Sequence, residues 1–120
     1  MASQHMIILG PGTPLVERVN RLSSETDQGL DLRSLQAGTV VNVYTRHSCY
    51  RLLVTDPGAG LACVTGGSMF PQTTDVRVEG AMVDGGIQAR RIAIGLRLEL
   101  WDGSKRITTS VVQSLAIDPP

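Results

Sequence analysis

Two stretches of alternating apolar and polar residues meet at the dipeptide Asp102–Gly103. Before the dipeptide, every second side chain is a branched aliphatic one: Ile92, Ile94, Leu96, Leu98 and Leu100. After it, the chain continues with a second stretch rich in β-branched residues, 105–117. A period of two is typical of a strand with one buried face. Asp-Gly favours a type I′ turn, because both of its central residues need φ > 0. The sequence therefore predicts an antiparallel hairpin over residues 91–117.

A two-residue turn would also fix which residues face one another across this hairpin. On the inner face it places Leu98 opposite Ile107, so that apolar side chains meet. On the outer face it places Glu99 opposite Arg106, so that opposite charges meet. The pairing of these residues is therefore a prediction in its own right.

The rest of the chain carries the same alternation in shorter pieces. We expect four more strands between turns rich in Gly, Pro and Asp, at residues 39–45, 49–55, 61–65 and 75–82. We expect residues 69–74 and 84–90 to be irregular connections, and Gly80 to mark a bulge or a bend. The predicted fold class is mainly β, with about six antiparallel strands in a small, partly open β-barrel or a two-sheet sandwich.

The N-terminal third has a different pattern. Thr13–Pro14 is typical of a helix start, with Thr as the N-cap and Pro at the first helical position. Four apolar side chains then recur at helical spacing: Leu15, Val16, Val19 and Leu22. They predict one short N-terminal amphipathic helix that ends near Ser23 or Ser24. This helix would pack on the rest of its own domain or on a partner.

We expect a single domain with three segments. Residues 1–5, which precede Met6, are expected to be a vector-derived remnant and are excluded from reasoning about the fold. Residues 6–38 would hold the helix and a linker, and residues 39–120 would form the β domain. No apolar stretch is long enough for a signal-peptide core or a membrane span. We therefore expect a cytoplasmic protein with no membrane partner.

Charge and aromatic content narrow the classes of partner. The chain has 11 basic and 11 acidic residues, which give a formal net charge of zero. A neutral chain has no overall field that attracts nucleic acid or an anionic membrane. Aromatic residues make up 3% of the chain, so stacking platforms for bases are scarce. A nucleic-acid partner is therefore possible but not favoured.

Arg46, His47 and Cys49 form the densest group of chemically reactive residue types. Such a group could bind a ligand, or supply a nucleophile with a nearby base. His5 falls in the expected remnant, which leaves a single histidine in the domain. Cys63, on the next expected strand, would lie roughly 17–20 Å from Cys49 at about 3.3 Å per residue, too far for a disulfide or a shared metal site. We therefore expect free thiols, no metal and no cofactor.

The outer face of the predicted hairpin carries four charged residues: Arg91, Arg97, Glu99 and Arg106. They are the predicted partner-binding face. Because the sequence contains no coherent catalytic set, we expect a non-catalytic protein-interaction or self-assembly module whose partner is a homo-oligomer or another protein. One alternative is a small-barrel nucleic-acid-binding protein that uses the outer-face arginines. A further alternative is a small-ligand binder or enzyme that uses the region of His47 and Cys49.

Overall fold

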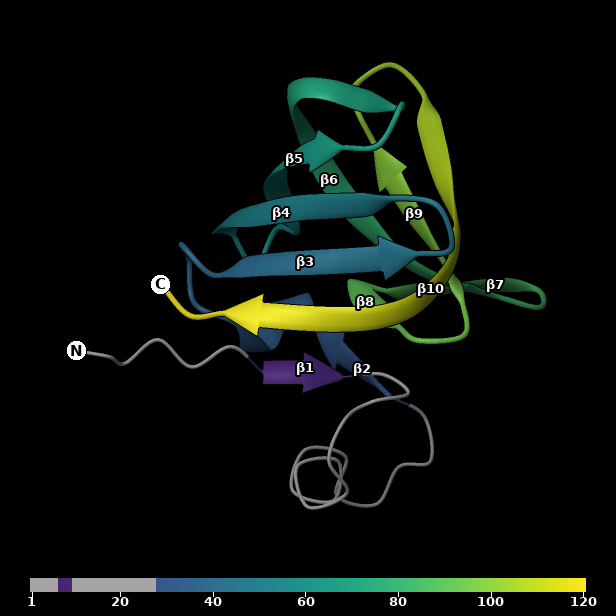
Figure 1. Ribbon diagram of the computed structural model, residues 1–120, viewed down its shortest axis with the longest axis horizontal. Coiled ribbons are helices and arrows are strands. Elements are labelled where there is room, and N and C mark those ends of the chain that lie inside the picture. The colour runs from purple at the N-terminus through teal and green to yellow at the C-terminus, as the bar shows by residue number, and fades with distance from the viewer. Residues whose placement is uncertain (1–6, 10–27) are drawn as a thin grey trace.

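The computed structural model describes residues 7–9 and 28–120 (Figure 1). In these residues the chain is mainly antiparallel β-sheet, with the strands β1 (Ile7–Leu9), β2 (Gly29–Asp31), β3 (Val40–Thr45), β4 (Cys49–Asp56), β5 (Leu61–Gly66), β6 (Phe70–Val83), β7 (Gly86–Ala89), β8 (Arg91–Ala93), β9 (Arg97–Trp101) and β10 (Arg106–Asp118). The helical element of the described part is one 3-10 turn, η1 (Leu32–Ser34). The predicted N-terminal helix, from Thr13 to Ser24, lies outside the described residues. Within the described ranges, no helix has the length and apolar character needed to cross a membrane.

The strands form a circuit of hydrogen-bonded neighbours. From β3 through β4 and β5 to β6, each strand pairs with the next, and β9 pairs with the other edge of β6. β10 pairs with β9 through residues 106–111 and, beyond a register shift, with β3 through residues 112–118. In Figure 1, β10 accordingly curves down from its hairpin with β9 and ends beside β3. The pairings therefore return to the strand from which they start, while β2 and β8 form a separate two-stranded sheet.

The inward side chains of these strands meet in one core that is largely aliphatic. Its fully buried members come from seven of the strands and from η1: Leu32, Val41, Val43, Leu52, Val54, Val64, Val78, Ile92, Leu98, Leu100 and Leu115. Tyr50 and Phe70 add an edge-to-face ring pair whose centroids lie 6.1 Å apart. Burial of each such side chain stabilises the fold by roughly 1.5–3 kcal/mol. Burial of the apolar side chains that recur at every second position is therefore a main source of stability of the described fold.

The β9–β10 hairpin confirms the predicted burial of Leu98, Leu100 and Ile107, but the predicted register is wrong. Leu100 pairs with Ile107, and Glu99 pairs with Thr108, so each strand partner is displaced by two residues. A displacement of two positions leaves every side chain on its original face of the sheet. Leu100 and Ile107 accordingly both lie in the core. The alternation therefore predicted the burial of these two side chains correctly, while the turn decided the register. Beyond the register shift between Thr108 and Val111 the predicted faces are wrong, because Val112 is buried and Val111 is 40% exposed.

The register differs because the turn contains four residues, 102–105, in place of the expected two. Asp102 Oδ1 accepts hydrogen bonds from the N–H groups of Ser104 and Lys105, at 2.8 and 2.9 Å. It also accepts one from Ser104 Oγ at 2.9 Å. A carboxylate that bonds to its own downstream backbone stabilises a turn of this kind. The dipeptide thus makes a turn, as predicted, but a wider one.

The prediction of one continuous strand over residues 91–101 is also wrong, because the segment is split into β8 and β9. Between them Gly95 adopts φ = +93°. The N–H of Ile94 donates to Gln28 O at 2.7 Å, whereas the N–H of Gly95 donates to Val112 O at 2.8 Å. At this point the chain leaves the small sheet and joins the circuit. The alternation continues across the break, so the sequence pattern did not reveal it.

Two expected connections prove to be strands. Most of residues 69–74 extends β6, which begins at Phe70. Residues 84–90 contain β7, which pairs with the last residues of β6. Val83 pairs with Gly86, so two residues, 84 and 85, make the turn of this hairpin. The short strand lacks a clear alternation of apolar and polar residues, which explains why the sequence pattern did not indicate it.

The bulge predicted at Gly80 is confirmed. The pairing of β6 with β9 shifts between Val78 and Gly80, and Gly80 adopts φ = +143°. A Cβ atom at this position would collide with the carbonyl oxygen of Gln88 in β7. Glycine therefore allows β7 to approach the bulged strand closely. The three-residue strands β1 and β2 were not predicted, since so few residues carry no readable period.

Candidate functional site

Three of the four residues of the predicted partner-binding face connect β9 with β10. Glu99 accepts a hydrogen bond from Thr108 Oγ1 and forms an ion pair with Arg106 Nε, both at 2.9 Å. The Glu99 side chain is only 4% exposed, so its carboxylate is used within the sheet. Arg97 donates from Nη1 to Thr109 O at 3.2 Å. Glu99 is therefore not accessible to a partner, whereas the Arg106 side chain remains 68% exposed.

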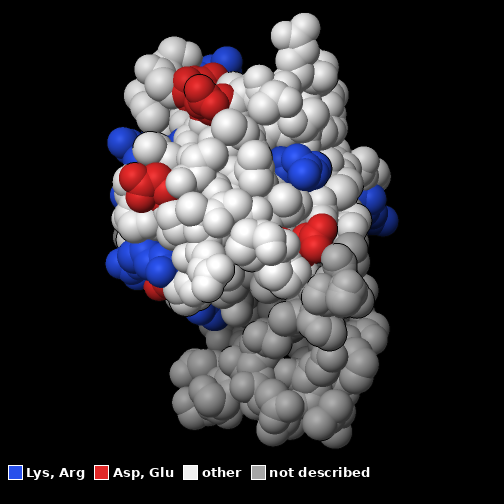
Figure 2. Space-filling view, turned by 90° about the vertical axis from the view of Figure 1, so that its left-hand side faces the viewer, with Lys and Arg blue, Asp and Glu red and all other residues white. Residues whose placement is uncertain are grey.

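The fourth residue, Arg91, lies on the separate two-stranded sheet. Its Cα partner is Asp31 in β2. The pKa of Asp31 is lowered, first by its hydrogen bond with Arg33 and to a smaller extent by the charge of Arg91. On the face drawn in Figure 2, acidic and basic side chains of the described residues are interspersed among uncharged atoms, and neither sign of charge forms a continuous patch. The role of these four residues in partner binding stays a prediction.

Arg46 and His47 form the exposed tip of the turn between β3 and β4. Cys49 is exposed on β4 and pairs with Tyr44 on β3. Burial raises the pKa of Tyr44, and the neighbouring Cys49 thiol adds to the shift. Within the described residues, no hydrogen bond joins His47 to Cys49. The structure therefore places the three predicted residues in one turn region without assembling a nucleophile and its base.

Both cysteines have free thiols, as predicted. Cys63 pairs with Leu53, which lies four positions along β4 from Cys49. In the part of the chain that the structure describes, no group of three or more His, Cys, Asp or Glu side chains could hold a metal ion.

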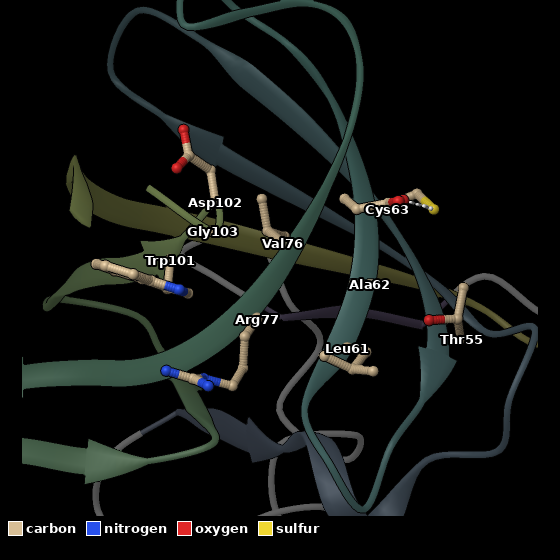
Figure 3. A pocket seen from close by; sticks show the side chains of 10 residues that line it. Thr55, Leu61, Ala62, Cys63, Val76, Arg77, Trp101, Asp102 and Gly103 are labelled. Carbon is tan, nitrogen blue, oxygen red and sulfur yellow. Dashed lines mark hydrogen bonds between the residues drawn. The ribbon is translucent and has the colours of Figure 1, made fainter. Parts of the chain in front are cut away.

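A depression of about 410 Å³ crosses the outer surface of β6. It is lined by side chains from β4, β5, β6 and the β9–β10 hairpin: Thr55, Leu61, Ala62, Cys63, Asp75, Val76, Arg77, Trp101, Asp102 and Gly103. Figure 3 shows Trp101 on one side and Leu61 on the other, with Arg77 between them. The depression therefore joins segments that lie far apart in the sequence.

The two apolar walls of the depression, Leu61 and Trp101, lie in one cross-strand row that spans β5, β6 and β9. Arg77 in β6 is the Cα partner of both Leu61 in β5 and Trp101 in β9. Because neighbouring strands are about 4.8 Å apart, the backbones of Leu61 and Trp101 are separated by about 10 Å. Leu61 is 41% exposed, and Trp101 is half-buried. Arg77 lines the depression between the two apolar walls, so an apolar side chain of a partner would pack against Arg77 as well as against these walls.

Asp75 adds a carboxylate to the neighbouring row. The Cys63 thiol donates a hydrogen bond to Asp75 Oδ1, with Sγ and Oδ1 3.2 Å apart. This bond is the main cause that raises the pKa of Cys63, followed by burial and by the charge of Asp75. Thiols react as thiolates, so a raised pKa makes Cys63 a poor nucleophile near neutral pH. The thiol is better suited to orienting the carboxylate than to covalent chemistry.

Asp75 also differs from the other charged groups of the depression. Arg77 pairs with Glu79, at 2.6 Å between Nε and Oε2. Asp102 pairs with Lys105, at 3.4 Å between Oδ2 and Nζ, and accepts the backbone bonds of its own turn. Asp75 forms no ion pair with any described residue. The depression therefore combines an apolar slot with one adjacent uncompensated negative charge.

The sequence contains a signal for this site in the residues of β5 and β9. Residues 61–65 alternate, and the inward positions belong to Ala62 and Val64. Leu61 consequently falls on the outer face, where a large aliphatic side chain is unusual on a solvated sheet. Trp101 shares the outer face with Glu99 in the predicted alternation. The cross-strand row that joins these two side chains depends on how β6 pairs with β9, which no local pattern indicated.

Comparisons of the chain with protein-family models, with curated proteins and with solved structures found no match. The geometry and the charge of the depression on β6 are therefore the features from which a function can be inferred.

Proposed function

We propose that the protein is a non-catalytic interaction module that binds a short segment of another protein in the depression between Leu61 and Trp101. The observation that carries the proposal is the combination of two accessible apolar walls with the uncompensated carboxylate of Asp75. An apolar side chain of the partner would fill the slot, and an adjacent Lys or Arg would pair with Asp75. Apolar anchors beside complementary charges are a common source of affinity and specificity in interfaces.

The openness of the site favours a protein segment over a small ligand. Sites for small molecules are concave and bury most of the ligand surface. Here Leu61 is 41% exposed and the Arg77 side chain is 44% exposed, so a small ligand would remain largely in water. A protein segment brings neighbouring residues that can cover the rim of the slot.

We also infer that the circuit of strands forms a small, partly open barrel in preference to a two-sheet sandwich. The support is the continuous pairing from β3 through β6, β9 and β10 back to β3. Such closure directs the aliphatic side chains inward and leaves the outer faces of β5, β6 and β9 for a partner.

Nucleic-acid binding through the outer-face arginines has weaker support. Affinity for phosphates requires cations that are available to the ligand. Arg97 and Arg106 already have partners within the sheet, and the chain has no net charge. A salt-dependent gel shift with single-stranded RNA would reopen this alternative.

A random peptide library, displayed on phage, probes the depression without assuming a sequence. We expect the selected peptides to share an apolar residue beside Lys or Arg. Synthetic versions should change the fluorescence of Trp101, the one tryptophan of the chain. Asp75→Asn should weaken binding by about tenfold, because it removes the charge that attracts the cation. Leu61→Lys should abolish it by placing a like charge in the slot.

Matched controls separate the site from the rest of the surface. Val111→Lys changes an equally exposed apolar residue, at 40%, on β10. Asp84→Asn removes an exposed carboxylate elsewhere. Both variants should bind the peptides as the unmodified chain does. Equal binding by Leu61→Lys, or a selection that yields no peptide able to change Trp101 fluorescence, would refute the proposed function.

A further inference from the structure

The hairpin of β6 and β7 extends from the side of the molecule (Figure 1). All four residues of β7 are exposed. Among the described strands, β7 pairs only with β6, so its second edge has no neighbour there. An unpaired strand edge is a template for another strand, because its N–H and C=O groups lack protein partners.

The hairpin geometry shows which backbone groups face that edge. The two-residue turn makes Val83 and Gly86 the closing pair, whose N–H and C=O groups point toward each other. At the other end of the strand, the N–H of Arg90 donates to Glu79 O at 3.0 Å. Successive residues of a strand direct their N–H and C=O groups alternately to its two edges. Because the backbone groups of Gly86 and Arg90 face β6, those of Ile87 and residue 89 face the free edge.

The side chains of β7 do nothing to block the approach of another strand. Exposed edges in natural proteins are usually protected by Lys, Pro or an inward-pointing charge. The residues of β7 are Gly, Ile, Gln and Ala, so none of these devices is present. Ile87 is 38% exposed, and Val83 on the neighbouring strand is 37% exposed. The edge therefore combines free backbone groups with accessible apolar surface.

We infer that β7 is the edge through which two copies of this chain associate, in an antiparallel strand pair with Ile87 opposite Ile87 of the partner subunit. This register is symmetric about a twofold axis, as a dimer of identical chains requires. It also gives each free N–H and C=O group of Ile87 a reciprocal partner. The inference concerns a different surface from the depression on β6 and does not depend on it.

Charge complementarity selects a second copy as the occupant. Asp84 precedes Ile87 by three residues and Arg90 follows it by three, so the symmetric register places Asp84 opposite Arg90 of the partner subunit. Asp84 is exposed and has no ion pair with any described residue. Arg90 bonds through Nη1 to Val78 O and has no carboxylate partner among the described residues. The Arg90 side chain also lies against Gly60, so its guanidinium would turn from Val78 O toward Asp84 of the partner subunit when the dimer forms. The dimer would then gain two symmetric ion pairs at the ends of the new ladder.

The interface is small, so the dimer should be weak and should dissociate on dilution. Stable interfaces generally bury about 1,200–2,000 Å², and a pair of four-residue strands covers less. Sedimentation velocity of the full chain over a wide range of concentrations should show a monomer–dimer equilibrium. Rising salt should weaken the dimer, because the two terminal ion pairs are exposed.

Two variants test the edge directly. Ile87→Lys should raise the dissociation constant by at least about tenfold, since two like charges would meet at the axis. Asp84→Asn should raise it by a smaller factor and remove most of the salt dependence. Circular dichroism of Ile87→Lys should match that of the unmodified chain, because the side chain is already exposed. Leu61→Lys is the matched control, with a similarly exposed apolar residue on a different surface, and should dimerise normally.

The outcomes for the two surfaces are distinguishable. Ile87→Lys should keep the peptide binding assigned to the depression on β6, and Leu61→Lys should lose that binding while it keeps the dimer. A folded Ile87→Lys variant with an unchanged dissociation constant would overturn the inference. A chain that remains monomeric at every concentration would overturn it as well, and would leave the peptide-binding proposal unaffected.

Discussion

Two hairpins of this protein carry the same Asp-Gly dipeptide and differ in almost every other respect. In the β9–β10 hairpin, Asp102–Gly103 opens a four-residue turn, and the strands bury Leu100 and Ile107 in the core. In the β6–β7 hairpin, residues 84 and 85 make a two-residue turn, and Ile87 remains exposed. The difference shows that Asp-Gly indicates a turn, whereas the neighbouring residues decide the width of the turn and the burial of the strands.

The neighbours act through identifiable contacts. Ser104 and Lys105 supply the N–H donors that bind Asp102 and widen its turn. Asp84 is followed by two glycines, 85 and 86, and Gly85 adopts φ = +84°, a conformation that suits a tight turn. One hairpin thus stabilises the fold, and the other presents a strand edge to solvent.

The largest expected difference between the hairpins lies in the cost of truncating an apolar side chain. Leu100 is fully buried, so Leu100→Ala should lower the free energy of unfolding by about 2–5 kcal/mol. Ile87→Ala should lower it by less than about 1 kcal/mol, because Ile87 is 38% exposed. Urea denaturation of dilute protein measures both values. Equal losses would show that the two hairpins contribute alike to stability.

The next largest difference in stability should come from the buried carboxylate of Glu99, in the β9–β10 hairpin. Glu99→Gln should destabilise the protein by about 1–3 kcal/mol, since it weakens charge-assisted bonds to Arg106 and Thr108. Asp84→Asn should change the stability by no more than about 0.5 kcal/mol, because no described residue bonds to that carboxylate. The same urea titration is used. If both variants cost the same, the Glu99 contacts do not hold the strands together.

Substitution of the turn glycine should cost the same stability in the two hairpins. Gly85 and Gly103 both adopt positive φ, at +84° and +97°, and neither would bring a Cβ atom within 4 Å of another residue. Gly85→Ala and Gly103→Ala should therefore each cost about 1 kcal/mol, from backbone strain alone. Thermal unfolding of the two variants measures the cost. A clearly larger loss for Gly103→Ala would mean that its turn contributes more than backbone conformation.

The smallest expected effect is a change in pH dependence. Hydrogen bonds from the N–H groups of Ser104 and Lys105 hold the pKa of Asp102 well below its usual value. A lowered folded-state pKa adds stability above the unfolded value of about 3.9, and this stability is lost as the pH falls toward the folded value. Asp102→Asn should therefore flatten the fall of the melting temperature in acid. Asp84→Asn should follow the unmodified profile, and parallel curves for all three proteins would contradict the assigned role of Asp102.

The sequence predicted what depends on local period and left out what depends on long-range pairing. The alternation placed Leu98 and Leu100 correctly in the core, because one face of a strand has a period of two. It did not indicate that Glu99, on the predicted outer face, is also buried. It did not reveal the break at Gly95, where the chain changes sheets without a change in period. It also did not join Leu61 to Trp101, since that row exists only after β6 pairs with both β5 and β9. The depression could therefore be recognised only from the assembled sheet.

Amide hydrogen exchange tests the contrast between the hairpins most directly, because it reports each strand separately. We predict that the amides of Leu100 and Ile107 are protected at every protein concentration. The amides of Ile87 and Ala89 should exchange rapidly in dilute protein and become protected as the concentration rises. Protection at Ile87 and Ala89 that does not vary with concentration would contradict the account, since β7 would then not be an edge that a second copy covers.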